Sequence, residues 1–355
     1  MRVKLKDITK FSKGTQINGK NLIDDGAYSY LNGGINPSGK WNEFNVAENT
    51  VTISEGGNSS GYVNYMNEAF WCGAHCYYLY DGPKNSKYLY YALKSQQERL
   101  FRIRSGACMP NIKKSDLGNF IIEYEEDETR QEEVVKVLEK CELLIEDYNK
   151  KLALLDEAVR ARFVEMFGDP NYNPKGYKKD IIKDHIDLLS GYPFKSENYV
   201  DSGINICGGL VIMPQKIKWE ECVHWKSAIG YENYLLNNND IVMALDRPWI
   251  SEGFKIAKVD SKHLPALLIQ RTVRIRAIDM NQDYLYYCFI CGGFNKHCNV
   301  TGSLVPHISS KDIKSFEVML PPLELQNQFA SFVQEIDKSR LLSNHSLFLI
   351  KSLTF

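Results

Sequence analysis

Apolar residues spaced alternately four and three positions apart occupy the middle of the chain. Residues 128–167 contain no proline and no glycine, and Gly168 and Pro170 follow them. This spacing is typical of a coiled-coil seam along one side of a long helix, which glycine and proline then end. The pattern predicts a helix of about 39 residues, roughly 58 Å long. The seam consists of Val134, Leu138, Cys141, Ile145, Tyr148, Leu152, Leu155 and Val159.

The segment before this helix has a different pattern. Residues 1 to about 125 are rich in glycine, asparagine and aromatic residues. Alternating apolar stretches such as Asn49–Ser54 and His75–Tyr80 predict short strands joined by long loops. Residues 177 to about 320 show this pattern again, so we expect a second domain of the same kind.

The two segments also share sequence. Tyr88–Phe120 aligns with Tyr284–Phe316 without a gap, and nine of the 33 positions are identical, where ordinary residue usage would give about two. A repeat of this length indicates a duplicated domain, because solenoid repeats are shorter. Three further matches need small gaps and pair residues 3–17 with 177–194, 48–61 with 238–253, and 73–81 with 269–277.

A second helix is predicted after Pro321 and Pro322. Its apolar residues continue the phase of the first seam 195 positions later, although Arg340 and Ser343 interrupt it. One heptad helix could be an internal packing helix, but two of them, each after a copy of the same domain, favour a spacer. The second seam consists of Phe329, Val333, Ile336, Leu347 and Ile350.

We therefore expect an α+β fold with two repeated α/β domains. The first helix leads into the second domain and the second helix must return, so a pair of them would form an antiparallel coiled coil with pseudo-two-fold symmetry. The predicted segments are a first domain at 1–127, a central helix at 128–168, a second domain at 169–322 and a C-terminal helix at 323–355.

Composition narrows the class of protein. The length of 355 residues predicts about two domains, and 44% hydrophobic residues allow real cores. A net charge of −1 argues against a simple basic coat for nucleic acid, although local basic faces remain compatible with it. The nine cysteines are scattered, and with no secretory signal peptide they indicate reduced thiols in the cytoplasm. No apolar run approaches the ~20 residues of a membrane span.

Two stretches carry a family resemblance. Thr301–Lys338 contains a Gly-x3-Pro-x-Ile sequence, a Pro-Pro-Leu turn and the start of the second helix, and Leu188–Val200 looks like the opening of a target-recognition domain. With the domain order, these stretches resemble the specificity subunit of Type I restriction-modification systems over essentially the whole chain. The first repeat departs from the family pattern, because Glu123–Glu133 replaces the Pro-Pro-Leu segment.

The resemblance implies a non-catalytic DNA-recognition subunit. Each domain would read one half of a bipartite target in double-stranded DNA, and the helices would set the unread gap and bind two methyltransferase subunits. Restriction-translocation subunits would join this complex in a bacterial or archaeal cytoplasm, with no membrane partner. This chain would hold no cofactor; S-adenosylmethionine, ATP and Mg²⁺ would belong to the partner subunits.

Basic side chains are candidates for binding phosphates, which position a protein on DNA without reading sequence. A single surface lysine or arginine is more often solvated charge. The candidates in the first domain are Lys10, Lys13, Arg99, Arg102, Arg104, Lys113 and Lys114. Those in the second domain are Lys195, Lys255, Arg271, Arg274, Lys296 and Lys311.

Loop residues with amide or guanidinium groups are better base readers, because Asn and Gln fit adenine and Arg fits guanine with two hydrogen bonds. Arg247 is predicted at a loop tip, with a salt bridge to Asp246 or Asp240 as the alternative. Tyr192 would stack on DNA or hold its loop, and Gly106 and Gly302 would serve backbone geometry. The candidate readers are Asn58, Ser59, Ser60, Gln96, Gln97, Arg247, Trp249, Asn295, His297 and Asn299.

Two other classes of protein stay open. Cys288, Cys291, His297 and Cys298 could suggest a zinc-dependent enzyme, but the positions aligned with the first two are Ala92 and Ser95, which favours a reduced core pair. A coiled-coil assembly adaptor that binds only proteins is the second alternative. The sequence shows no Walker lysine loop and no methyltransferase motif.

Overall fold

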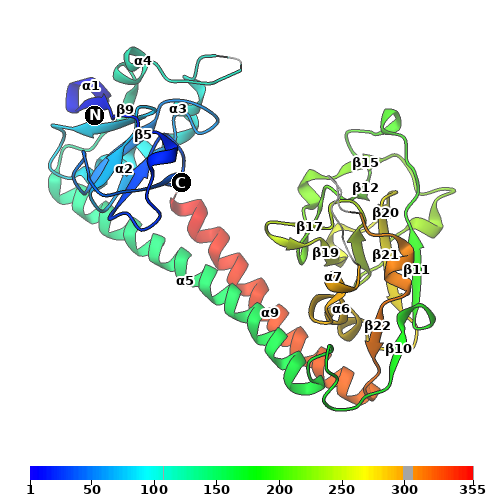
Figure 1. The fold of residues 1–355 in the computed structure, drawn as a ribbon. Coiled ribbons are helices and arrows are strands. Elements are labelled where there is room, and N and C mark those ends of the chain that lie inside the picture. The colour runs from blue at the N-terminus through cyan, green and yellow to red at the C-terminus, as the bar shows by residue number, and fades with distance from the viewer. Residues whose placement is uncertain (107, 299–306, 355) are drawn as a thin grey trace. The chain divides into compact units, whose positions relative to one another are not determined.

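The computed structural model describes residues 1–106, 108–298 and 307–354, and it divides into two compact units. The first unit is Met1–Asn149 with Asn344–Phe355, and the second is Lys150–Ser343. Each unit contains one globular domain and part of each of two long helices (Figure 1). None of the helices in the described ranges is long and apolar enough to cross a membrane.

The domain of the first unit is built on a four-stranded antiparallel sheet. Its spatial order is β2 (Lys10–Lys13), β8 (Cys76–Tyr80), β5 (Thr50–Ser54) and β6 (Val63–Met66). A three-stranded sheet has the order β4 (Gly39–Trp41), β3 (Tyr28–Leu31) and β7 (Phe70–Cys72), with β3 and β7 parallel. β1 (Arg2–Lys4) pairs with β9 (Ile121–Glu123). The short helices are α1 (Leu5–Ile8), α2 (Ser86–Lys94), α3 (Gln97–Arg102) and α4 (Lys114–Gly118).

The domain of the second unit repeats this topology. Its main sheet has the order β11 (Ile186–Ser190), β21 (Thr272–Ala277), β16 (Ile241–Ala244) and β19 (Ile256–Lys258). Its three-stranded sheet has the order β15 (Val223–Trp225), β12 (Ile204–Cys207) and β20 (Ala266–Leu268), with β12 and β20 parallel. β10 (Lys179–Ile181) pairs with β22 (Glu317–Met319). The helices are α6 (Gln282–Cys291), α7 (Phe294–His297) and α8 (Ser310–Lys314).

Two hairpins of the second domain have no counterpart among the described residues of the first: β13 (Ile212–Met213) with β14 (Lys216–Ile217), and β17 (Trp249–Ile250) with β18 (Gly253–Phe254). Otherwise the strands correspond one to one, in the same spatial order and with the same directions. The duplicated domain and the three gapped matches predicted from the sequence are therefore confirmed.

One inner strand of each main sheet is buried along nearly its whole length. All four residues of β16 are buried, and so are Val51 to Ser54 of β5. β16 is an apolar run, as expected for a strand covered on both faces. β5 alternates apolar and hydroxyl side chains, and both of its faces are nevertheless covered.

The long helices are α5 (Glu128–Phe167) and α9 (Leu323–Thr354). α5 begins in the first unit and ends in the second, whereas α9 begins in the second and ends in the first, so the two run antiparallel. They pack together, and in the second unit Phe163 of α5 lies 5.5 Å from Phe329 of α9 between ring centroids. The α+β class with paired antiparallel helices is confirmed, while the pseudo-two-fold relation stays a prediction.

Most of the seam residues are the less exposed positions of their helices. Val159, Phe329, Val333 and Leu347 are buried, but Val134 is 41% exposed, so the first position of the predicted seam is wrong. The two polar interruptions remain inside the seam. Arg340 forms an ion pair with Asp156 at 2.6 Å, and the hydroxyl of the buried Ser343 donates to its own helix.

Candidate nucleic-acid interface

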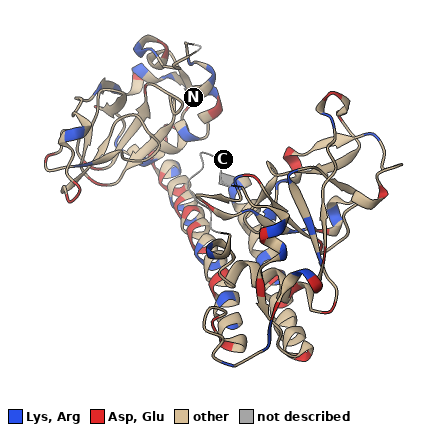
Figure 2. Cartoon of the chain, turned by 45° about the vertical axis from the view of Figure 1, so that its right-hand side comes forward, with Lys and Arg blue, Asp and Glu red and all other residues tan. Residues whose placement is uncertain are grey.

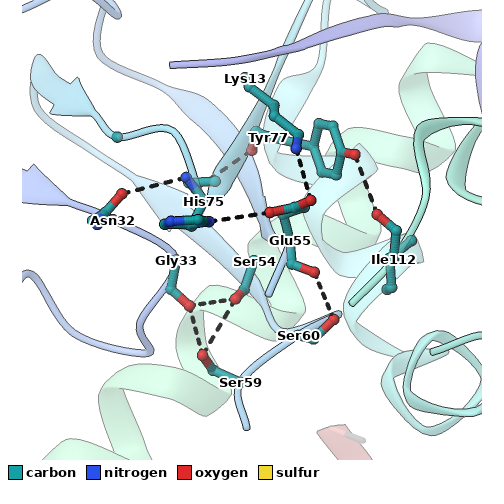
Figure 3. A network of polar contacts seen from close by, with 12 residues as sticks. Lys13, Asn32, Gly33, Ser54, Glu55, Ser59, Ser60, His75, Tyr77 and Ile112 are labelled. Carbon is teal, nitrogen blue, oxygen red and sulfur yellow. Dashed lines mark hydrogen bonds and ion pairs between the residues drawn. The ribbon is translucent and has the colours of Figure 1, made fainter. Parts of the chain in front are cut away.

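Three loops meet at one end of the main sheet of the first domain, and Glu55 joins their side chains (Figure 3). Its carboxylate lies 2.7 Å from Lys13 Nζ and 3.3 Å from His75 Nδ1. Lys13 ends β2, Glu55 follows β5 and His75 precedes β8. Lys13 also lies 5.6 Å from the ring centroid of the buried Tyr77. One end of the sheet therefore presents an ammonium and an imidazole around one carboxylate.

The loop that follows β5 is held by serine hydroxyls. Ser59 Oγ donates to the Gly33 carbonyl at 2.6 Å, and Ser54 Oγ donates to the same oxygen. Ser60 Oγ donates to the Glu55 carbonyl at 2.8 Å, and the Ser60 side chain is fully buried. The prediction that Ser60 reads a base is therefore wrong, because its hydroxyl faces the loop backbone.

Gln97 is also a structural residue. Its amide donates to the Gly61 carbonyl at 2.6 Å and accepts from the Val63 amide at 3.0 Å, so both ends are occupied and its predicted role as a base reader is wrong. Gln96 is half-buried, and its amide donates to the Ala92 carbonyl at 3.2 Å and accepts from Arg99. Gln96 is thus a poor candidate for base contact.

Three arginines of the first domain, Arg99, Arg102 and Arg104, lie on α3 or just after it. The Arg104 guanidinium lies 4.1 Å from the Phe101 ring centroid and donates to the backbone carbonyl of Asn58 at 3.3 Å. Asn58 itself is exposed. Arg99 and Arg102 line an open hollow of about 400 Å³. Lys113 and Lys114 are exposed, whereas Lys10 forms an ion pair with Asp81 at 2.9 Å.

The second domain has a matching cluster around Asp246. This carboxylate lies 2.9 Å from Arg271 and 2.7 Å from His307. Burial alone would raise the pKa of Asp246, but the hydrogen bonds from His307 and Arg271 hold this pKa below its ordinary value. Asp246 therefore stays ionised, with a permanent cation and an imidazole beside it.

Backbone bonds show that the two clusters lie at corresponding ends of the two main sheets, although only one pair of their residues holds the same position. The Glu55 amide donates to the His75 carbonyl at 2.8 Å, and the Leu245 amide donates to the Arg271 carbonyl at 2.9 Å. His75 and Arg271 thus hold the same position, directly before β8 and β21. Gly14 and Gly191 approach a neighbouring carbonyl in the same way, since an added Cβ would lie 1.9 Å from Cys72 O and 2.0 Å from Ile269 O.

Arg247 lies at the tip of the loop between β16 and β17, exposed and with a φ of 45°. Positive φ is uncommon for a non-glycine residue, so the loop is held in an unusual conformation at this side chain. Asp246 is engaged by Arg271 and His307, and the buried Asp240 is engaged by Arg276. Within the described residues Arg247 forms neither of the two salt bridges considered as alternatives.

Other candidates of the second domain are structural. Lys255 is 7% exposed and donates to the Gly209 carbonyl, and Arg274 is 6% exposed and pairs with Asp187. Their predicted phosphate contacts are therefore wrong. His297 is half-buried, with Nε2 3.0 Å from the Asp312 carbonyl, and it lies against Phe316. It supports α8 and is a poor base reader.

The remaining candidates differ in exposure. Tyr192 packs against Phe194 and Tyr231, as expected for a residue that holds its loop. Trp249 stacks on Phe254 at 5.0 Å and is half-buried. Asn299 and Gly302 lie outside the described residues. The exposed candidates that stay predictions are Lys195, Arg271, Asn295, Lys296 and Lys311.

The structure also tests two smaller expectations. Gly106 has a φ of +97°, so its predicted role in backbone geometry is confirmed. Cys288 and Cys291 lie on α6, where burial raises the pKa of Cys291 to about 11. Among the residues with described positions, no three His, Cys, Asp or Glu side chains gather as metal ligands.

Four members of the two clusters were missed by sequence reasoning: Glu55, His75, Asp246 and His307. They lie far apart in the sequence, so only the sheet brings them together. A usable signal was present, because each lies within two residues of a predicted strand or of the repeated Gly-x3-Pro-x-Ile stretch. Basic and acidic residues are mixed over the whole chain (Figure 2), so charge alone does not single these four out.

Comparison with known protein families identifies the family of this chain. Residues 1–156 and 179–350 each match the Type I restriction modification DNA specificity domain. The two matches cover most of the chain, one in each repeat, and the chain therefore belongs to this family.

Two proteins with similar sequences are named as specificity subunits of Type I restriction enzymes. The MjaVIII specificity subunit of Methanocaldococcus jannaschii is 26% identical over 268 residues, which are 70% of this chain and 63% of that protein. The EcoAI specificity subunit of Escherichia coli is 30% identical over 188 residues, 50% of this chain and 31% of that protein. The alignments thus span less than two thirds of either relative.

A solved structure shares the fold. The S subunit from M. genitalium superimposes with a TM-score of 0.61 at 18% identity, over 100% of this chain and 93% of that one.

Proposed function

We propose that the chain is the DNA-specificity subunit of a Type I restriction-modification complex, with each domain reading one half of a bipartite target. The observation that carries this proposal is the duplication of the site: each domain presents a cation, a carboxylate and an imidazole at the corresponding end of its own main sheet. Two readers in one chain would impose a fixed separation on two half-sites, as a dimer does.

Within each domain the exposed side chains divide into two roles. Arg102, Lys113 and Lys195 are exposed ammonium or guanidinium groups suited to phosphates, which supply affinity without sequence information. Arg247 and Asn58 are exposed on loops beside the clusters, with geometry suited to guanine and adenine respectively. The acidic members, Glu55 and Asp246, orient the neighbouring cations and can accept from cytosine.

The helices would bind the methyltransferase subunits. Outside the seam they expose large apolar side chains, with Leu143 61%, Leu154 64%, Leu342 69% and Phe348 68% exposed. Soluble monomers rarely leave such rows of apolar residues uncovered. We assign this helix surface to two methyltransferase subunits, with restriction-translocation subunits joining them and S-adenosylmethionine, ATP and Mg²⁺ held by these partners.

The same exposed apolar residues would also suit a coiled-coil adaptor that binds only proteins. The adaptor hypothesis gives no role to the matched clusters at the two sheet ends. Mapping methylated bases across the source genome, with and without this gene, separates the two functions. The specificity role predicts that a two-part motif with an unread gap loses methylation on deletion, whereas an unchanged methylation map would favour the adaptor.

A further inference from the structure

Each long helix carries a carboxylate that binds the adjacent recognition domain. Glu142 of α5 and Asp337 of α9 are 195 positions apart, the same offset that relates the two seams (337 − 142 = 195). Each directly follows a seam residue, Cys141 and Ile336. The two carboxylates therefore occupy equivalent flanks of the two helices.

In the first unit Glu142 binds the helix α2 of the recognition domain. The buried Tyr91 donates its hydroxyl to Glu142 Oε2 at 2.8 Å, and Lys87 Nζ lies 4.0 Å from the same oxygen. Burial raises the pKa of Tyr91 above its ordinary value, and the hydrogen bond to the Glu142 carboxylate raises this pKa further. The hydroxyl thus remains a donor at neutral pH.

In the second unit Asp337 lies in a larger charged network. Lys258, at the end of β19, lies 2.7 Å from Asp283 and 3.3 Å from Asp337. Arg340 then joins Asp337 and Asp156 at 2.6 Å each, which links α9 to α5. Burial opposes the charge of Lys258, but Asp283 and Asp337 raise its pKa above the ordinary value, so this lysine stays charged.

Hydrogen bonds to charged groups are short, directional and stronger than neutral ones. A domain bound to its helix by such bonds cannot tilt without breaking them. The loops that would meet DNA lie at an end of the main sheet, so a small rotation at the helix would displace them along the duplex.

We propose that Glu142 and Asp337 are positioning residues, which fix the orientation of each recognition domain on its helix and so determine the number of base pairs between the half-sites. This inference rests on the proposed function. It assigns the gap length to two domain–helix joints as well as to the length of the helices.

The test is made in the source cells with chromosomal variants. E142Q and D337N weaken the two joints, and Y91F removes only the hydroxyl at the first joint. E165Q is the matched control, because among the described residues the exposed Glu165 carboxylate pairs only with the half-buried Arg162 of its own helix, at 2.8 Å. Methylation is read at genomic copies of the motif whose gap is the normal length, one base pair shorter or one longer.

The wild type and E165Q should methylate only the normal gap. In the three joint variants, methylation at the wrong gaps relative to the normal gap should rise on the order of five- to tenfold, because a charge-assisted bond is lost. The half-site sequences should not change. A general loss of stability would lower methylation at the normal gap but could not create methylation at the wrong gaps.

Unchanged gap selectivity in Y91F, E142Q and D337N, with normal methylation of the proper sites, would overturn the inference and leave the proposed function standing. If D337N abolishes methylation by unfolding, Y91F decides, since the tyrosine ring remains in the core. If the wild type methylates no gapped motif at all, the proposed function itself is contradicted, and this inference with it.

Discussion

Arg271 occupies in the second domain the backbone position that His75 occupies in the first, and each reaches a carboxylate on the loop after the central strand. The duplication has thus preserved the place of a polar cluster while its residues have changed. Sites that keep their place and vary their side chains are suited to reading two different half-sites.

Arg247→Ala should relax one base position in one half of the target and leave the other half unchanged. A good bidentate arginine–guanine pair discriminates by about 1–3 kcal/mol. Methylation mapping of the variant checks this expectation. Arg247→Lys is the matched control, since it keeps the charge but lacks the planar fork, and it should relax the same position. A uniform loss at all sites in both variants would instead show a phosphate contact.

Gln97→Ala should lower stability without altering the target. It leaves the Gly61 carbonyl and the Val63 amide without their partners, which costs about 1–3 kcal/mol for each buried group. Chemical denaturation measures the loss, and Glu98→Ala at the exposed neighbouring position should be nearly neutral. Full stability together with a changed motif would restore Gln97 as a base reader.

Asp246 should stabilise the second domain at neutral pH and lose this effect in acid. Its pKa is lower in the folded chain than in the unfolded one, so the stabilisation is complete above about pH 4 and declines as the pH falls further, through the folded pKa. Unfolding of the wild type and Asp246→Asn should therefore differ most at neutral pH and converge as the pH falls below the folded pKa of Asp246. A difference that grows in acid would contradict this assignment.

Leu154→Glu and Leu342→Glu should weaken association with the methyltransferase subunits while leaving the fold intact, since both side chains are more than 60% exposed. Co-purification from the source cells, with circular dichroism of the variants, measures both effects. Glu157→Gln, an exposed polar position of α5, is the control. Unchanged association in both leucine variants would assign the partner surface elsewhere.

The sequence predicted the elements well because their signals are periodic and local. The heptads fixed the seam from Leu138 to Val159, and the ungapped repeat identified two copies of one topology. Side-chain roles depended on tertiary contacts instead. Gln97 and Asn58 have similar amide chemistry, but the Gln97 amide is bonded to the backbone after β5, whereas Asn58 is exposed.

The burial of charged side chains could not be predicted from the sequence either. Lys255 and Arg274 belong to the same residue types as the exposed Arg247, yet the sheet covers both of them. The clusters around Glu55 and Asp246 could not be assembled from spacing, because their members come from strands that are neighbours only in the folded sheet.

The central claim is that each domain reads one half of a divided target. Its most direct test is selection of random DNA duplexes by the complex purified from the source cells through a tag on this chain, followed by sequencing. The account predicts two defined blocks separated by a constant number of undefined base pairs, with Arg247→Ala altering one block only. A single continuous motif, or no enrichment over random DNA, would contradict it.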